Sequence, residues 1–214
     1  MTGLSDAALA RLNLEIEFSV SPENELSPLP GGDSGVPWVY VTRTGESLVA
    51  YISRDLDSAL KKRLRELGAR RLFDDPDAVT HAAEVEGTPS ASALEQSSIC
   101  EGRVLERKPA HSEYADVIER DGAYVVLRGC QVVARAWTVR GDSRASEIAV
   151  ETDEDCRRQG LARQVASAWA AATIVQGRVA FYSFRRENAA SRALADSLET
   201  RSYGIAVGYA PKKG

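Results

Sequence analysis

The chain has 214 residues, 43% of them hydrophobic and 27% charged, a composition typical of a soluble globular protein with one large domain or two small ones. Its net charge of −4 argues against general affinity for nucleic acid, and no apolar run approaches the roughly 20 residues of a membrane helix. The N-terminus lacks the apolar core of a signal peptide, so we expect a cytoplasmic protein without a membrane partner.

Cysteine and histidine are too few and too widely spaced to build a metal site or a disulfide framework. There are three cysteines and two histidines, and no two cysteines have C-x-x-C spacing. We therefore expect no metal ion. A Ser-His-Asp or Cys-His centre would have to use His81 or His111, and neither lies in a context typical of such a centre.

The chain begins with patterns that predict a short helix, a loop and a hairpin. Residues 4–18 read as a short helix that runs into an extended segment, and residues 21–37, with four prolines and three glycines, predict a loop. Two runs of β-forming residues, 38–41 and 48–52, flank a turn that contains glycine. They predict a β-hairpin.

Two helices are predicted after this hairpin. Asp55 precedes a run with leucine on one face that ends at Gly68, so we expect Asp55 to cap a helix and Gly68 to close it. A weaker helix is predicted at 77–85. Both belong to an α+β region.

A small and polar segment, residues 86–98, predicts a boundary in the chain. We therefore expect an N-terminal α+β region at residues 1–98 and a second domain at residues 99–214. A short strand at 103–105 would open the second domain.

The second domain shows a regular succession of strands and helices. Residues 123–127 and 131–139 predict a hairpin, and residues 146–152 predict the next strand. Residues 158–177 carry apolar side chains at helical spacing and end in glycine, and residues 179–184 form a short apolar run. These patterns predict a mixed sheet with a helix packed on it.

A second helix and a last strand close the chain. Asn188 stands before a helical apolar stripe, and residues 203–209 read as extended. The last strand has no obvious following partner in the chain, so it would form an exposed edge. For this reason we count a homodimer among the expectations.

The turn between the strand at 146–152 and the following helix predicts an anion site. Backbone N–H groups and the helix dipole converge at a helix N-terminus, and Gly160 would allow a phosphate to approach the backbone closely. The acidic side chains at 153–155 would repel a phosphate, so we expect them to face solvent. The sequence Arg157-x-x-Gly160-x-Ala162 in this turn resembles motif A of the GNAT superfamily of acyl-CoA-dependent N-acetyltransferases, which reads Gln/Arg-x-x-Gly-x-Gly/Ala.

A second stretch strengthens this resemblance. The run that starts at Asn188, with Ser191 three positions on and Leu194 and Leu198 along one stripe, looks like motif B of the same family. The order hairpin, strand, turn, helix, strand, helix, strand is also the order of the GNAT core. The resemblance covers about the last 95 residues and implies an α+β fold: a central mixed, twisted sheet flanked by helices, preceded here by an N-terminal extension.

The resemblance also implies which residues hold acetyl-CoA. Strand residues Ala149 and Val150 would hydrogen-bond the pantetheine arm, and the backbone of the turn would hold the pyrophosphate. Arg157 either contacts phosphate or only solvates the turn. Asn188 and Ser191 have a cofactor role and an equally good structural role, the N-cap in the case of Asn188. The full set of expected cofactor-binding residues is Ala149, Val150, Arg157, Arg158, Gln159, Gly160, Leu161, Ala162, Asn188 and Ser191.

Acyl transfer to an amine needs a base and an acid besides positioning. Glu147 lies on the strand where several family members carry a base, with Glu151 in reserve on the same face by alternation. Glu147 could equally be an unpaired, exposed strand carboxylate.

The acid is less well defined by the sequence. The tyrosine that many GNATs carry seven residues after the motif B asparagine is replaced by Ala195, and Glu199 and Thr200 stand where Gly-Phe is usual. Tyr182 and Tyr203 are the phenols that could substitute as the acid, although each also has a plain packing role.

Two functions follow from the resemblance. The first is an N-acetyltransferase that moves an acetyl group from acetyl-CoA directly to a primary amine of a small molecule or peptide. The second is a GNAT-fold protein that binds an acyl-CoA or a partner with weak or no catalysis, because the usual tyrosine is absent at position 195.

Overall fold

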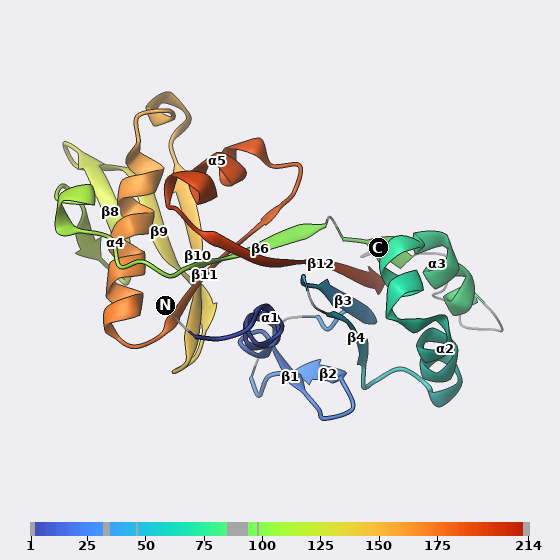
Figure 1. Ribbon diagram of the computed structural model, residues 1–214. Coiled ribbons are helices and arrows are strands. Elements are labelled where there is room, and N and C mark those ends of the chain that lie inside the picture. Colours follow the sequence, from blue (N-terminus) through green and yellow to red (C-terminus); the bar gives the residue numbers. More distant parts are fainter. Residues whose placement is uncertain (1–2, 32–34, 46, 85–93, 98, 212–214) are drawn as a thin grey trace. The chain divides into compact units, whose positions relative to one another are not determined.

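The computed structural model describes residues 3–31, 35–45, 47–84, 94–97 and 99–211 (Figure 1). Residue contacts divide the chain into two compact units. The N-terminal unit contains Ser5–Glu101 and the end of the chain from Tyr203, and the C-terminal unit contains Gly102–Ser202 and the first few residues. Within the described ranges, none of the helices is long and apolar enough to cross a membrane.

The N-terminal unit is a mixed sheet with helices. Its strands pair in the order β1-β2-β4-β3-β12, and β5 also pairs with β12. Leucine and valine side chains from two helices pack against the sheet in one buried cluster, so the helices and strands share a core. The elements are α1 (Asp6–Glu15), β1 (Phe18–Val20), β2 (Glu25–Pro28), β3 (Val39–Arg43), β4 (Leu48–Ser53), α2 (Ser58–Asp74), α3 (Pro76–Glu84), β5 (Leu94–Gln96) and β12 (Arg201–Pro211).

Three local expectations for this unit were wrong. The cap of α2 is Asp57, whose carboxylate accepts from the Leu60 N–H at 2.8 Å, and not Asp55. Gly68 has a φ of 73° and kinks α2, but the helix continues beyond it to Asp74. The expected loop at 21–37 contains β2, because its backbone pairs with β1 and β4. The predicted boundary at 86–98 lies largely outside the described residues.

The last strand is not the exposed edge that we expected. Ile205–Tyr209 pair antiparallel with Val39–Arg43, and Tyr209–Pro211 pair with β5. The pairing partners lie more than 100 residues away in the sequence, so no local pattern indicated them. The argument for a homodimer through this edge therefore no longer holds.

The C-terminal unit contains the strand–turn–helix that carries the glycine motif. Its sheet has the order β6-β11-β10-β9-β8-β7, in which β10 and β11 run parallel and β7 to β10 pair antiparallel. The sheet is therefore mixed, as expected. The elements are β6 (Cys100–Leu105), the 3-10 turn η2 (His111–Glu113), β7 (Ile118–Arg120), β8 (Ala123–Arg128), β9 (Gln131–Gly141), β10 (Ala145–Thr152), η3 (Glu154–Cys156), α4 (Leu161–Val175), β11 (Val179–Arg185) and α5 (Ala189–Ser197).

Helix α4 covers one face of this sheet (Figure 1). Val165 and Trp169 are buried against the strands, and the Trp169 indole donates to the Thr138 hydroxyl at 2.9 Å, which satisfies its one polar group. Helix α5 joins the same core through Ala195 and Leu198. The molecule is thus of the mixed α+β class, with a sheet flanked by helices, and this prediction is confirmed.

Candidate active site

Strands β10 and β11 pair over only part of their length. The ladder runs from Ala145 opposite Val179 to Glu147 opposite Phe181, whereas β10 continues to Thr152 and β11 to Arg185. From Ile148 onward β10 is paired with β9 and not with β11. The edge of β10 at Ala149 and Val150 therefore offers backbone groups to an extended ligand, in the way that a sheet edge binds an added strand.

A β-bulge lies where the two strands part. Across β9 and β10, Glu147 faces Arg140 but Ile148 faces Thr138, so Val139 is an extra residue on β9. Bulges bend a strand and redirect its side chains. This bulge brings Arg140 beside the carboxylate of Glu147.

Glu147 is buried and paired, which differs from the exposed, unpaired alternative that its sequence left open. Only 4% of the residue is exposed, and its Oε2 accepts from Arg140 Nε at 2.6 Å. Glu147, Ala149 and Glu151 lie on the face of β10 away from α4, because Ile148 and Val150 pack into the α4 core. The two carboxylates therefore share a face, as their alternation predicted.

The reserve carboxylate, Glu151, has a different environment. It is more than half exposed and forms an ion pair with Arg135, 2.7 Å between Oε2 and Nη2. The Arg135 guanidinium also lies 4.7 Å from the centre of the Trp137 ring. Of the two carboxylates, Glu147 alone is enclosed by protein.

The loop between β10 and α4 presents backbone amides. Gly160 is the N-cap of α4 with a φ of 78°, and the first intrahelical bond runs from the Gln164 N–H to its carbonyl at 3.1 Å. The N–H groups of Leu161, Ala162 and Arg163 precede that bond, so the helix itself gives them no acceptor. A helix of 15 residues adds the positive end of its dipole.

The same loop explains why the helix starts three residues later than predicted. Arg158 has a φ of 62°, and Gly160 is also left-handed, so neither is helical. A Cβ built on Gly160 would meet nothing within 4 Å. In the absence of a ligand, Gly160 is therefore required for its backbone conformation and not for lack of space.

Charges around the loop are mostly exposed. Asp153, Glu154 and Asp155 face solvent, and Arg157 pairs with Glu154 at 3.2 Å. Arg128, at the end of β8, contacts the loop through Cys156 and Gln159. No local pattern pointed to Arg128, because its place depends on how the β8–β9 hairpin meets a loop about 30 residues further on.

Tyr182 lies on the other face of the sheet from Glu147. It packs into the core that α4 and α5 share, is 7% exposed, and its hydroxyl is hydrogen-bonded to the Ser191 side chain. Burial raises the pKa of this phenol above its usual 10. The structure therefore does not bring Glu147 and Tyr182 together on one face.

Asn188 and Ser191 have visible structural roles, whereas Tyr203 lies in the other unit. The Asn188 carboxamide accepts from the Ser191 N–H at 3.0 Å and caps α5. Ser191 in turn holds Tyr182. Tyr203 is 5% exposed and belongs to the N-terminal unit, so the geometry of the C-terminal unit assigns it no role.

Comparison with known proteins identifies the family of the C-terminal unit. Residues 109–202 match the family model described as GNAT acetyltransferase, and this range lies within the C-terminal unit. These residues form a GNAT domain. No curated protein matches the chain.

Solved structures with similar folds include three described as members of the same family. A putative acetyltransferase of the GNAT family from Novosphingobium aromaticivorans is 16% identical (60% of this chain and 71% of that chain, TM-score 0.46). An acetyltransferase from the GNAT family of Colwellia psychrerythraea is 10% identical (90% and 80%, TM-score 0.46). A GCN5-related N-acetyltransferase from Kribbella flavida is 15% identical (100% and 98%, TM-score 0.43). The assignment of the GNAT domain rests on the family model.

The GNAT domain departs from the family pattern at the end of α5. Ala195, where many members carry tyrosine, is fully buried in the core. Glu199 stands at the usual glycine and keeps a left-handed backbone with a φ of 55°, which a glycine would adopt at lower cost. The Thr200 hydroxyl donates to the Ala195 carbonyl at 2.9 Å and closes the helix end. The backbone of the motif is thus kept while its side chains differ.

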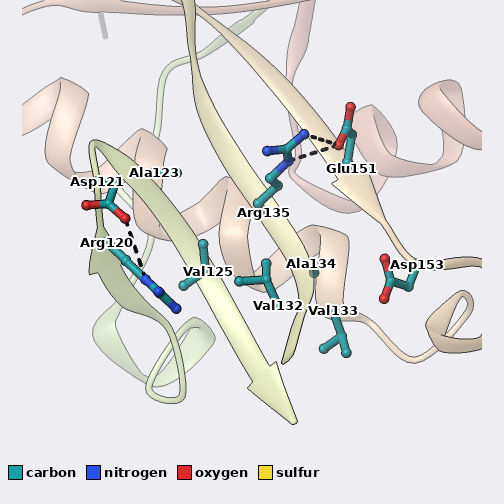
Figure 2. A pocket seen from close by; sticks show the side chains of 10 residues that line it. All are labelled: Arg120, Asp121, Ala123, Val125, Val132, Val133, Ala134, Arg135, Glu151 and Asp153. Carbon is teal, nitrogen blue, oxygen red and sulfur yellow. Dashed lines mark hydrogen bonds and ion pairs between the residues drawn. The ribbon is translucent and has the colours of Figure 1, made fainter. Parts of the chain in front are cut away.

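A pocket of about 520 Å³ lies beside strands β8 to β10 of the GNAT domain (Figure 2). Its lining combines alanine and valine side chains with two ion pairs, Arg120 with Asp121 and Arg135 with Glu151. Of the lining residues, the sequence had named Glu151 as the reserve base and Asp153 as one of the acidic side chains expected to face solvent. The residues that line it are Arg120, Asp121, Ala123, Val125, Val132, Val133, Ala134, Arg135, Glu151 and Asp153.

The described ranges contain no group of three or more His, Cys, Asp or Glu side chains that could hold a metal ion.

Proposed function

We propose that the protein is an N-acetyltransferase that moves an acetyl group from acetyl-CoA directly to a primary amine. The observation that carries this proposal is the parting of β10 and β11 beside a loop whose helix-start amides have no intrahelical acceptor. The unpaired edge of β10 suits an extended, amide-containing arm, and the free amides at the start of α4 suit a diphosphate. CoA contains both groups. The GNAT domain at 109–202 supports this assignment.

Binding of CoA would depend mainly on the backbone. The amides from Arg158 to Ala162 would hold the pyrophosphate, with the dipole of α4 behind them. The β10 edge at Ala149 and Val150 would pair with the pantetheine arm and direct the thioester toward the bulge beside Glu147. Few particular side chains are needed for this arrangement.

The transfer itself would depend on side chains near the bulge. An amine attacks a thioester carbonyl only as the neutral base, so a carboxylate that accepts its proton raises the reactive fraction. Glu147 has the first claim to this role, because it is enclosed and fixed in place by Arg140. Glu151 remains the reserve.

Tyr182 is our candidate for the group that protonates the leaving thiolate. Its phenol stays protonated at neutral pH, since burial raises its pKa further above 10. Tyr182 lies on the face of the sheet that packs against α4 and α5. For this role, the sulfur of bound CoA must reach that face between β10 and β11. Tyr182→Phe tests this: loss of turnover with unchanged acetyl-CoA affinity supports the role, and unchanged turnover excludes it.

A second candidate function is CoA binding with weak or no catalysis. Two observations favour it: Ala195 fills the usual tyrosine position, and Glu147 is engaged by a guanidinium at 2.6 Å. In that case the protein would bind acetyl-CoA as a ligand and not as a substrate.

One experiment separates the two functions. Purified protein is mixed with acetyl-CoA and a broad panel of small-molecule and peptide amines, while free thiol release and CoA affinity are measured. Amine-stimulated thiol release supports the transferase. Tight CoA binding without such release supports the second function, and absence of CoA binding excludes both. We extend the proposal to a cytoplasmic protein, because that compartment supplies acetyl-CoA.

A further inference from the structure

The phosphate loop, residues 153–160, is attached to a neighbouring hairpin by one arginine. Arg128 ends β8, and its guanidinium contacts the Cys156 Sγ at 3.4 Å and donates to the Gln159 carboxamide oxygen. The Gln159 amide in turn donates to the Asp155 carbonyl at 3.3 Å. A single guanidinium thus contacts the loop at two positions, three residues apart.

The start of β9 provides a second attachment from the same hairpin. The Gln131 amide donates to Asp153 Oδ2 at 3.0 Å, and the Asp153 N–H donates to the Val133 carbonyl at 3.0 Å. The end of the β8–β9 hairpin therefore holds the loop at its beginning and near its end. Of these groups, the Arg128 guanidinium is the only one that carries a positive charge.

The loop needs such a charge, because its own composition is unfavourable for an anion. It contains three carboxylates, at 153–155, and two arginines, Arg157 and Arg158. Glu154 already engages Arg157 at 3.2 Å. A diphosphate that approached the amides of α4 would meet a loop that is net negative, and Coulomb repulsion would weaken its binding.

The loop also holds two left-handed backbone conformations. Arg158 has a φ of 62°, which is unfavourable for an L-residue other than glycine, and Gly160 has a φ of 78°. Such conformations persist when the surrounding structure fixes them. Arg128 contacts Cys156 just before this segment and Gln159 within it, so its contacts bracket the left-handed Arg158.

We propose that Arg128 is a positioning residue for CoA: it fixes the phosphate loop through Cys156 and Gln159 and places a positive charge beside the bound diphosphate. The inference rests on the proposed function only in naming CoA as the ligand. The contacts that carry it belong to the chain itself.

The first experiment compares ligands with and without phosphate. Dissociation constants for CoA, dephospho-CoA and pantetheine are measured with wild type, Arg128→Lys and Arg128→Gln. For Arg128→Gln we expect affinity for both diphosphate ligands to fall on the order of tenfold, the size expected for one charge-assisted hydrogen bond, with pantetheine unchanged. Arg128→Lys keeps the charge and should lose less.

A matched control removes the same charge elsewhere. Arg144 lies in the turn between β9 and β10, at the opposite end of these strands, and pairs with Asp142 at 2.8 Å. Arg144→Gln should leave all three affinities unchanged. The proposal would be overturned if Arg128→Gln lost as much affinity for pantetheine as for CoA, or if it lost no affinity for CoA.

The second experiment measures how firmly the phosphate loop is held, through the reactivity of Cys156 and without any CoA ligand. Cys156 is 6% exposed under Arg128, so iodoacetamide should modify it slowly in wild type and several-fold faster in Arg128→Gln, with exposed Cys130 as an internal reference. Modification is followed at each cysteine by mass spectrometry. If wild type binds no CoA, the proposed function fails, and the rate at Cys156 still decides whether Arg128 fixes the loop: an unchanged rate overturns the inference.

Discussion

The two ends of strand β10 are built on different principles. At its C-terminal end the site consists of backbone: the left-handed Gly160, the first amides of α4 and the unpaired strand edge. At its N-terminal half the site consists of side chains, the buried Glu147 and its partner Arg140 across a bulge. Under the proposed function, the C-terminal end would bind the diphosphate (the phosphate end) and the N-terminal half would determine whether a reaction follows (the reacting end).

This difference predicts that substitutions at the two ends have separable effects. Changes at the reacting end should alter turnover with little change in acetyl-CoA affinity. Changes at the phosphate end should do the reverse. A substitution at one end that changed both quantities together would contradict the division.

The largest effect is expected at Glu147. Removal of a general base lowers turnover by about 10²–10⁴-fold, so Glu147→Gln should abolish most amine-stimulated thiol release while acetyl-CoA affinity is kept. The measurement is steady-state thiol release with an active amine.

The control for this change lies two positions further along the same face. Glu151→Gln removes an exposed carboxylate that is also paired with an arginine. It should leave turnover nearly unchanged. If both variants lose turnover equally, the base is not assigned, and if Glu147→Gln only lowers thermal stability, the carboxylate is structural.

The next largest effect is expected from substitution of Gly160, and it concerns the affinity for acetyl-CoA alone. Trp at this position would be strained at a φ of 78° and would cover the amides of α4, so Gly160→Trp should weaken acetyl-CoA binding by about 100-fold or more. Isothermal titration of acetyl-CoA measures the loss.

The other end of the same helix offers a matched control. Gly177 has a φ of 74° and also has nothing within 4 Å of an added Cβ, so Gly177→Trp carries similar backbone strain. We expect the two variants to lose comparable stability, by roughly 1–2 kcal/mol, but only Gly160→Trp to lose the ligand. Equal losses of affinity would show that strain, and not the phosphate loop, accounts for the effect.

The sequence predicted the phosphate end better than the reacting end, for a physical reason. Helix periodicity, the glycine in the turn and the Asn188 cap are local patterns, and the structure shows elements where they predicted them. The pairing of Glu147 with Arg140 depends on an extra residue, Val139, in a neighbouring strand. Register of this kind is set by tertiary packing and leaves no local pattern.

The distinction between local patterns and tertiary packing also explains the other features that the sequence did not predict. The pairing of β12 with β3 joins residues more than 150 positions apart, and Arg128 meets its loop across the hairpin. Asp57 was missed as the cap of α2 because Asp55 and Asp57 both precede the apolar stripe. The GNAT resemblance predicted the fold class and the family model that residues 109–202 match; it did not indicate which of two tyrosines, if either, donates a proton.

A smaller effect is expected where motif B departs from its family. Glu199 holds a φ of 55° at the usual glycine position, and its exposed ion pair with Arg107 at 3.3 Å contributes little. Glu199→Gly should therefore stabilise the protein by about 1 kcal/mol and leave acetyl-CoA affinity unchanged. Urea unfolding measures the gain, with Glu199→Ala as control: Ala removes the ion pair without relieving the backbone, so a gain of equal size in Ala would contradict this explanation.

The smallest effect concerns a side-chain contact to the first turn of α4. Glu113 accepts from Arg107 at 2.9 Å and from the Ala110 N–H at 2.7 Å, and it pairs with Arg163 of α4 at 3.1 Å. These contacts lower the pKa of the Glu113 carboxyl to about 2, and the hydrogen bond from the Arg107 guanidinium is the largest cause. A carboxyl whose pKa is lower in the folded than in the unfolded protein stabilises the folded state at pH values above its unfolded pKa, which is near 4.5. This stabilisation is lost as the pH falls toward 2.

Glu113→Gln should accordingly be less stable than wild type at pH 7, with a difference that shrinks between pH 4.5 and pH 2 in denaturant unfolding. Arg163→Gln removes the contact to α4 but keeps Arg107, the main cause of the shift, so most of the pH dependence should persist in that variant. Acetyl-CoA affinity should change little in both variants, since the proposed diphosphate site at the phosphate end of β10 is formed mainly by backbone amides. A large loss of affinity in Arg163→Gln would show that a side chain of α4 contributes to that end in addition to the proposed contribution of Arg128, and the amides of α4 would then not be its main contacts.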